Sequence, residues 1–185
     1  MRFTRILAAA AVLLGASLTT YASAQVESTP IPAPNKPNFA PVEFLVGTWT
    51  CKTKSARRPA AYVTTSTYAL DPTGYWLNET STTAKTAWVS KPLTTTDRIT
   101  YDSDSKRWVD VLWGDGGAYG LSVSKGWNGD KIVWHDLSFA PGPDISSQTD
   151  VTATKESATK LTSMSTFTET KTGRHVSVSA VCTKD

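Results

Sequence analysis

The chain has 185 residues, a usual length for one domain. Its 19 basic and 16 acidic residues give a formal net charge of +3. Two of the basic residues, Arg2 and Arg5, lie in an expected leader, which would leave 17 basic against 16 acidic residues. That balance argues against nucleic-acid binding, which depends on clustered Lys and Arg. Two His and two Cys exclude most metal-cluster and zinc-finger arrangements, so we expect no metal site.

Residues 1–24 have the pattern of a secretory signal peptide. Arg2 and Arg5 precede an apolar run over 6–18, and Ala22-Ser23-Ala24 supplies the small residues that a signal peptidase accepts. The run is shorter than the roughly 20 residues that a membrane-spanning helix needs. We therefore expect a secreted or periplasmic protein with no membrane span once the leader is removed.

Prolines dominate the next segment, 25–41. They occupy positions 30, 32, 34, 37 and 41, and proline favours extended, solvated backbone. This composition predicts a disordered linker, followed by a folded domain over 42–185.

Within 42–185 the apolar residues recur with a period of two, between segments of turn-forming residues. Thr and Ser make up about a quarter of the chain, and β-branched Thr suits a pleated strand. The predicted strands are 45–54, 61–70, 75–83, 95–101, 107–113, 119–125, 131–139, 148–154, 160–170 and 174–183. About ten short strands joined by hairpins indicate an up-and-down sandwich or barrel.

Clean alternation in two strands predicts which side chains face the core. In the last strand Val176, Val178 and Cys182 share one face. In the strand over 119–125, Tyr119, Leu121 and Val123 share a face opposite two serines and a glycine. We expect these apolar faces to point inward. The strand over 131–139 is apolar on both faces, and its orientation stays open.

The two cysteines decide between an open and a closed sheet. In an exported chain, Cys51 in the first strand and Cys182 in the last are expected to form a disulfide. A disulfide needs Cα atoms about 4–7 Å apart, so the first and last strands must be neighbours. The prediction is an all-β, closed up-and-down antiparallel barrel of about ten strands, monomeric because closure removes the edge strands.

Pairing Cys51 with Cys182 in an antiparallel seam also fixes the register. Trp49 then lies opposite Lys184, and both side chains share the inward phase of the cysteines. A Lys over an indole ring gains cation–π attraction of about 0.5–2 kcal/mol. We expect Trp49 and Lys184 to form the structural pair that closes the barrel.

The segment Phe44-Leu45-Val46-Gly47-Thr48-Trp49 resembles the Gly-x-Trp opening of lipocalin-like (calycin) barrels. Its form is closest to bacterial lipocalin-like domains of unknown function of the DUF1579 type, and it is distantly similar to nitrobindin-like ten-stranded barrels. The nitrobindin-like proteins bind haem through a late histidine, whose counterpart here would be His175. Because the alternation of the last strand turns His175 away from Cys182, we expect no cofactor, with haem as the alternative.

The interior of such a barrel predicts the function. A closed barrel of this size either packs its interior or holds one small ligand. We expect an exported binding protein for a small, partly apolar molecule, with Trp113, Tyr119, Leu121 and His135 lining the cavity.

Two other functions stay open. An enzyme could use the same cavity for acid–base chemistry of the cyclase, isomerase or hydrolase kind, with His135, Asp110 or Glu79 as catalytic residues. A glycan-binding module could stack sugars on tryptophans at the barrel rim, namely Trp76, Trp88 and Trp127.

Overall fold

The computed structural model describes residues 33–140, 145–148 and 150–185. The predicted signal peptide, 1–24, and the first part of the predicted linker, 25–32, lie outside these residues. Strands make up most of the described chain, with one 3₁₀ turn, η1 (Glu43–Leu45), and no α-helix among the described residues. The strands are β1 (Gly47–Ser55), β2 (Tyr62–Leu70), β3 (Leu77–Thr83), β4 (Leu93–Asp102), β5 (Arg107–Gly114), β6 (Tyr119–Ser124), β7 (Trp127–Asn128), β8 (Lys131–Ala140), β9 (Ile145–Gln148), β10 (Val151–Ser157), β11 (Lys160–Glu169) and β12 (His175–Lys184).

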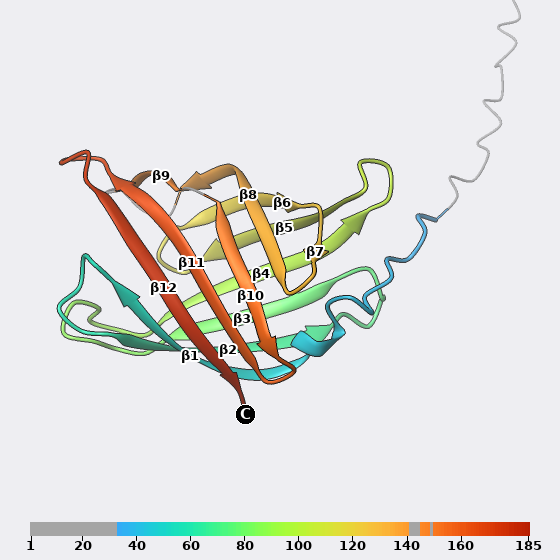
Figure 1. Cartoon of the computed structure of the whole chain (residues 1–185), viewed down its shortest axis with the longest axis horizontal. Coiled ribbons are helices and arrows are strands. Elements are labelled where there is room, and N and C mark those ends of the chain that lie inside the picture. The colour runs from blue at the N-terminus through green and yellow to red at the C-terminus, as the bar shows by residue number, and fades with distance from the viewer. Residues whose placement is uncertain (1–32, 141–144, 149) are drawn as a thin grey trace, which may run out of the picture. The chain divides into compact units, whose positions relative to one another are not determined.

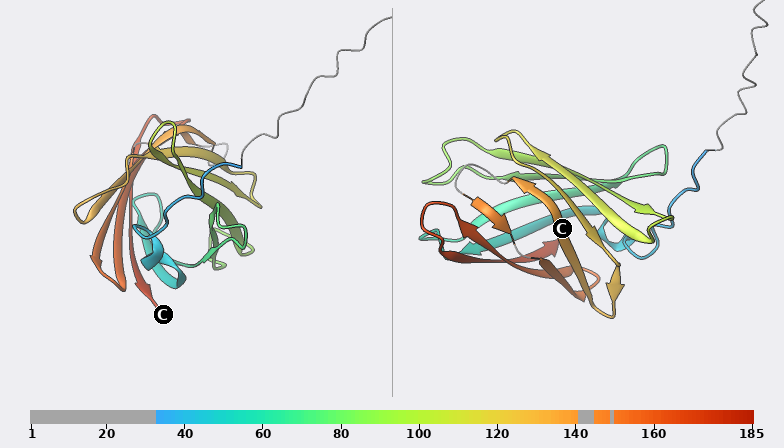
Figure 2. Two further views of the ribbon diagram at one scale, coloured as in Figure 1. Left: turned by 90° about the vertical axis from the view of Figure 1, so that its right-hand side faces the viewer. Right: turned by 90° about the horizontal axis from the view of Figure 1, so that it is seen from above.

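Ten of these strands close into a barrel in which every pair is antiparallel (Figure 1). The order runs β10-β11-β12-β1-β2-β3-β4-β5-β6-β8, and β8 pairs with β10 to complete the ring. The short strands β7 and β9 pair with β8 and β11 outside this path. The view along the barrel in Figure 2 shows the ring of strands around η1. The predicted fold class, a closed antiparallel barrel of ten strands, is confirmed.

The seam between β1 and β12 has the register expected from the cysteines. Cys51 and Cys182 are joined by a disulfide, with their Cα atoms 3.9 Å apart. Trp49 lies opposite Lys184 and is only 1 % exposed. The Lys184 Nζ lies 5.7 Å from the Trp49 ring centroid and donates a hydrogen bond of 2.9 Å to the Phe44 carbonyl. The Trp49 Nε1 donates to the Leu45 carbonyl at 2.7 Å, so both side chains also hold the 3₁₀ turn.

Gly47 makes this arrangement possible. Its φ of +123° lies outside the range that other residues readily adopt. A Cβ at this position would lie 2.9 Å from the Lys184 Cε. The Gly-x-Trp opening therefore combines a ring that accepts Lys184 with a backbone that leaves room for it.

The segment before β1 packs against one end of the barrel. Phe39 and Val42 are buried with Leu77, Ile99 and Trp108 in the main apolar cluster. Upstream, the Tyr75 hydroxyl donates to the Pro34 carbonyl at 2.9 Å, and the Lys36 Nζ lies 5.8 Å from the Tyr75 ring centroid. The compact unit is thus Pro34–Asp185. It begins before the predicted boundary at Val42, because Phe39 supplies a core side chain from within the proline-rich segment.

Replacing Lys184 by methionine tests the seam. Lys184→Met keeps the apolar stem but removes the ammonium from the Trp49 ring and from the Phe44 carbonyl. The free energy of unfolding should fall by about 1–2 kcal/mol. Urea unfolding followed by Trp fluorescence measures it. Lys52→Met, on the exposed face of β1, is the matched control. Equal stability of the two variants would contradict the role of Lys184.

Candidate functional site

The four residues predicted to line the cavity lie on the outer face of the barrel. Trp113 is 44 % exposed and Tyr119 57 % exposed, and the two are paired across β5 and β6. Leu121 follows two residues later on the same face of β6. His135 on β8 pairs with Val123, which has the same phase on β6 as Tyr119 and Leu121 although it is only 9 % exposed. The inward placement of these residues was wrong.

The reason lies in the inner face of β6, which carries only small residues. Gly120, Ser122 and Ser124 are buried. A Cβ on Gly120 would lie 3.0 Å from the Phe139 side chain and 3.1 Å from that of Leu112, so the neighbouring strands fill this space. The apolar alternation of β6 therefore marks its outer face, opposite to the usual rule.

Neither histidine reaches the interior. The His135 Nδ1 lies 2.8 Å from the Asp150 Oδ2, and both side chains are 52 % exposed. His135 thus meets a carboxylate, but on the outer surface. His175 is exposed at the start of β12, where its Nδ1 lies 3.2 Å from the Thr168 hydroxyl. The position of His175 does not fit a haem ligand inside the barrel.

A cavity of about 130 Å³ lies inside the barrel, between η1 and the middle of the strands. Its apolar wall is formed by eight side chains: Val42, Leu45, Ile99, Trp127, Ile132, Trp134, Ala153 and Leu161. Its polar wall is formed by Tyr68, Glu79 and Asp110. The interior therefore offers one apolar side and one acidic side.

The acidic side belongs to a row of four carboxyl groups on the inner face, here called the carboxyl belt: Glu79, Asp97, Asp110 and Asp136. Glu79 on β3 lies directly opposite Asp97 on β4. Asp110 on β5 pairs with Ser122 on β6, which in turn pairs with Asp136 on β8. Successive strands thus bring together acidic residues that are far apart in sequence.

Hydroxyl groups hold one end of the carboxyl belt in place. The Ser81 hydroxyl donates to the Glu79 Oε1 at 2.6 Å and lies 2.6 Å from the Ser66 hydroxyl. Tyr68, opposite Glu79 on β2, is hydrogen-bonded to the Glu79 carboxyl group. Burial, together with the negative charge of Glu79, raises the Tyr68 pKa well above its ordinary value. Tyr68 is therefore a neutral hydrogen-bond donor beside the acids.

Burial makes ionisation of three acids of the belt unfavourable. It raises the pKa of Asp97 to about 9, with Glu79 and Asp110 adding like charge. It raises the pKa of Asp110 to about 7, where Glu79 and Asp136 add to the effect and the hydrogen bond with Ser122 opposes it. Burial followed by the charge of Asp150 raises the pKa of Asp136 to about 6. Protons are thus retained in the belt at neutral pH.

Two polar atoms at the cavity wall have no hydrogen-bond partner. The Asp110 Oδ1 and the Trp127 Nε1 are both buried and unpaired. Leaving a buried polar group unpaired costs about 1–3 kcal/mol. The cavity therefore presents an unused acceptor and an unused donor.

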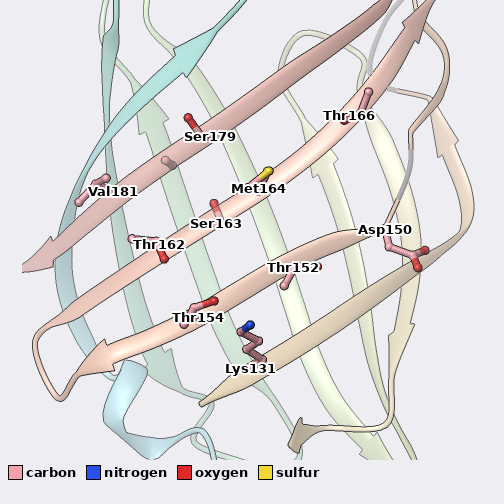
Figure 3. Close-up of a pocket in the computed structure, with 11 residues that line it drawn as sticks. Lys131, Asp150, Thr152, Thr154, Thr162, Ser163, Met164, Thr166, Ser179 and Val181 are labelled. Carbon is pink, nitrogen blue, oxygen red and sulfur yellow. The ribbon is translucent and has the colours of Figure 1, made fainter. Parts of the chain in front are cut away.

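A larger hollow of about 550 Å³ lies on the outer surface, over β8, β10, β11 and β12 (Figure 3). Threonines, Lys131 and Asp150 form most of its wall, and Met164 within it is 63 % exposed. It is an open, shallow groove without a buried polar group. The interior cavity is the better candidate site.

The cations at the far end of the barrel have partners of their own. A pocket of about 240 Å³ there is lined by Arg57, Arg58 and Trp88, among others. The Arg57 Nε lies 3.2 Å from the Glu169 Oε1, and the Arg58 guanidinium lies 5.7 Å from the Trp88 ring centroid. Neither is among the charges that act on the Asp97 and Asp110 carboxyl groups.

The tryptophans do not form an exposed stacking surface. All seven Trp are within the described residues, and Trp113 is the one that is exposed. Of the three predicted rim residues, Trp76 and Trp88 are partly buried and Trp127 packs against the core cluster. This distribution gives no support to a glycan-binding rim.

No protein-family model matches the chain, and no curated protein matches it. Among solved structures it is similar to a protein of unknown function of the DUF3598 family from Nostoc punctiforme, at 18 % identity and a TM-score of 0.36. The match covers 85 % of this chain but only 52 % of that protein, so the chain spans about half of its length. The lipocalin-like, DUF1579-type resemblance stays a prediction.

The described residues contain neither a cluster of metal-ligating side chains nor a membrane-spanning helix. No cluster of three or more His, Cys, Asp or Glu side chains is placed to hold a metal ion. None of the helical segments is long and apolar enough to cross a membrane. Both statements apply to residues 33–140, 145–148 and 150–185.

Sequence reasoning found Glu79 and Asp110 but missed Tyr68, Asp97 and Asp136. A usable signal was present in three consecutive strands. Leu77-x-Glu79, Asp97-x-Ile99 and Trp108-x-Asp110 each place an acid two residues from a fully apolar inward side chain. An acid in the phase of buried residues on neighbouring strands predicts an interior cluster.

The carboxyl belt predicts that the protein loses stability as the pH rises. Unfolded carboxyl groups titrate near pH 4, whereas Asp97 and Asp110 titrate at about 9 and about 7 in the fold. Between these values the folded state binds more protons, so the free energy of unfolding falls from about pH 4 to about pH 9. Asp71, Asp102 and Glu169 have lowered pKa values, and the stability they contribute is lost only in acid.

Asp97→Asn isolates this effect. The variant removes a carboxyl group whose ionisation burial opposes, so it should be more stable than the wild type by about 1–3 kcal/mol at pH 9. Its free energy of unfolding should also fall less steeply with rising pH. Urea unfolding at pH 5, 7 and 9 measures both. Asp104→Asn, in the exposed turn after β4, should leave the slope unchanged. A wild-type stability that rises between pH 5 and 9 would rule out the belt as described.

Proposed function

We propose that this protein binds a small, partly apolar molecule inside the barrel. The observation that carries the proposal is the interior cavity, whose apolar wall faces Tyr68, Glu79 and Asp110. Ligand sites combine largely apolar walls with a few convergent polar groups. The unpaired Asp110 Oδ1 and Trp127 Nε1 add two positions at which a ligand gains hydrogen bonds.

The size of the cavity restricts the ligand. An engineered apolar cavity of about 150 Å³ in another protein holds benzene. The cavity here, at about 130 Å³, suits a molecule of one ring or a short chain. Larger ligands would need the side chains at its wall to move.

The proposed setting is outside the cytoplasm, in secreted or periplasmic form. The Cys51–Cys182 disulfide supports it, because disulfides persist in oxidising compartments. The expected leader over 1–24 supports the same setting.

Acid–base catalysis is the second candidate, and one observation favours it. Burial and neighbouring acids raise the pKa of Asp110 to about 7, which is the range in which a general acid or base works best at neutral pH. Glu79 beside it would be the partner, whereas His135 is excluded by its place on the outer surface. Substrate would occupy the same cavity as a bound ligand.

Native mass spectrometry of the protein purified from its own host tests the binding. The wild type should carry a reproducible bound mass. Ala153→Phe, which fills the cavity from β10, should abolish the bound mass. Thr152→Phe changes the preceding residue, which lies on the outer face, and should keep the bound mass. Thermal melting checks that both variants fold. An empty wild type, or an equal bound mass in Ala153→Phe, would refute binding in the cavity.

A further inference from the structure

We propose that the ligand of the barrel carries a protonated amine, and that the Glu79 and Asp110 carboxyl groups bind this amine at the cavity wall. The inference rests on the proposed function and adds the chemical class of the ligand.

The first support is the sign of the charge inside the barrel. The charged neighbours that act on Asp97 and Asp110 are other carboxyl groups. Two lysines also face inward, but each lies over an aromatic ring nearer η1. The Lys155 Nζ is 3.9 Å from the Phe44 ring centroid, and the Lys184 Nζ is held by Trp49 and Phe44. Among the described residues, no cation therefore acts on the Asp97 and Asp110 carboxyl groups.

The second support is the unused hydrogen-bonding capacity. The Asp110 Oδ1 is buried at the cavity wall with no donor, and the Asp136 Oδ2 further along the belt is also unpaired. An ammonium group offers three donors and no acceptor, which matches a wall of carboxyl oxygens. The unpaired Trp127 Nε1 is a hydrogen-bond donor at the same cavity. A hydroxyl or ether oxygen elsewhere on the ligand would accept its hydrogen bond.

The third support is the apolar wall opposite the acids. Ile99, Ile132 and Leu161 would cover a hydrocarbon body while Glu79 and Asp110 hold the head. A bare metal ion makes no favourable contact with an apolar wall. In the described part of the chain, moreover, no group of three ligating side chains is placed to hold a metal ion. A small organic amine satisfies both sides of the cavity.

Binding should release protons. Because burial holds protons on the belt, a bound ammonium takes the place of a carboxyl proton, and that proton passes to solvent. The ligand keeps its own proton, so the charge of the cavity is balanced before and after binding. A neutral ligand of the same shape leaves the carboxyl proton in place.

Benzylamine and benzyl alcohol are a matched pair of probes. Isothermal titration calorimetry at pH 7, in two buffers of different ionisation enthalpy, measures affinity and proton release together. Benzylamine should bind at least about tenfold more tightly than benzyl alcohol and release protons, whereas the alcohol should release none.

Variants locate the selectivity. Glu79→Gln and Asp110→Asn should each lower benzylamine affinity about tenfold or more and leave benzyl alcohol within about twofold. Asp104→Asn, in the exposed turn after β4, is the control and should change neither affinity.

The outcomes separate the two proposals. Benzyl alcohol that binds as tightly as benzylamine, with loss of both in Ala153→Phe, would overturn the amine inference and leave the proposed function standing. Benzylamine that binds equally well to Ala153→Phe would also overturn the inference, because its site would lie elsewhere. An empty protein in native mass spectrometry, with no binding of either probe, would overturn the proposed function itself.

Discussion

Lys184 lies between the Trp49 ring and the Phe44 carbonyl, and this contact joins the first and last strands of the barrel, β1 and β12. The disulfide between Cys51 and Cys182 lies one inward position further along the same pair of strands. In the chain-entropy model, a crosslink over 131 positions contributes about 5 kcal/mol. The seam fixes the phase of β1 and β12, and antiparallel pairing transmits that phase to each neighbour in turn. From β1 to β5 the pairing is unbroken, so the inward positions of Glu79, Asp97 and Asp110 follow from this register.

The fold could be predicted because its signals are local and redundant. Alternation, turn residues and Thr content located nearly all of the strands, and the cysteines closed the sheet with the observed register. The start of the domain was harder to predict than the strands. A high proline content suggests solvated backbone, yet Phe39 within that segment is buried. The extra strands β7 and β9 are short pairings that depend on the finished barrel, and local pattern does not determine them.

The site was harder to predict, since it depends on which of two faces is inner. In β6 the neighbours Leu112 and Phe139 fill the interior, so the small face turns inward and the apolar face turns out. That reversal moved Trp113, Tyr119, Leu121 and His135 from the predicted cavity to the surface. The sequence identified Glu79 and Asp110 as candidate catalytic residues. Their proximity to each other, and to Asp97, follows only from the pairing of β3, β4 and β5.

The carboxyl belt and the seam have opposite effects on the stability of the fold: ionised acids destabilise it, and the seam stabilises it. Asp97, Asp110 and Asp136, whose pKa values burial raises, oppose folding as soon as they ionise, whereas apolar side chains at the same positions would not. The barrel tolerates this because its closing strands are crosslinked and its end near η1 is packed with Trp49, Leu77 and Trp108. A costly polar row beside a cavity, inside a fold stabilised elsewhere, is the distribution expected where selection retains a site at the expense of stability. On this argument the acids of β3 to β5 concern recognition, and the seam keeps them in register.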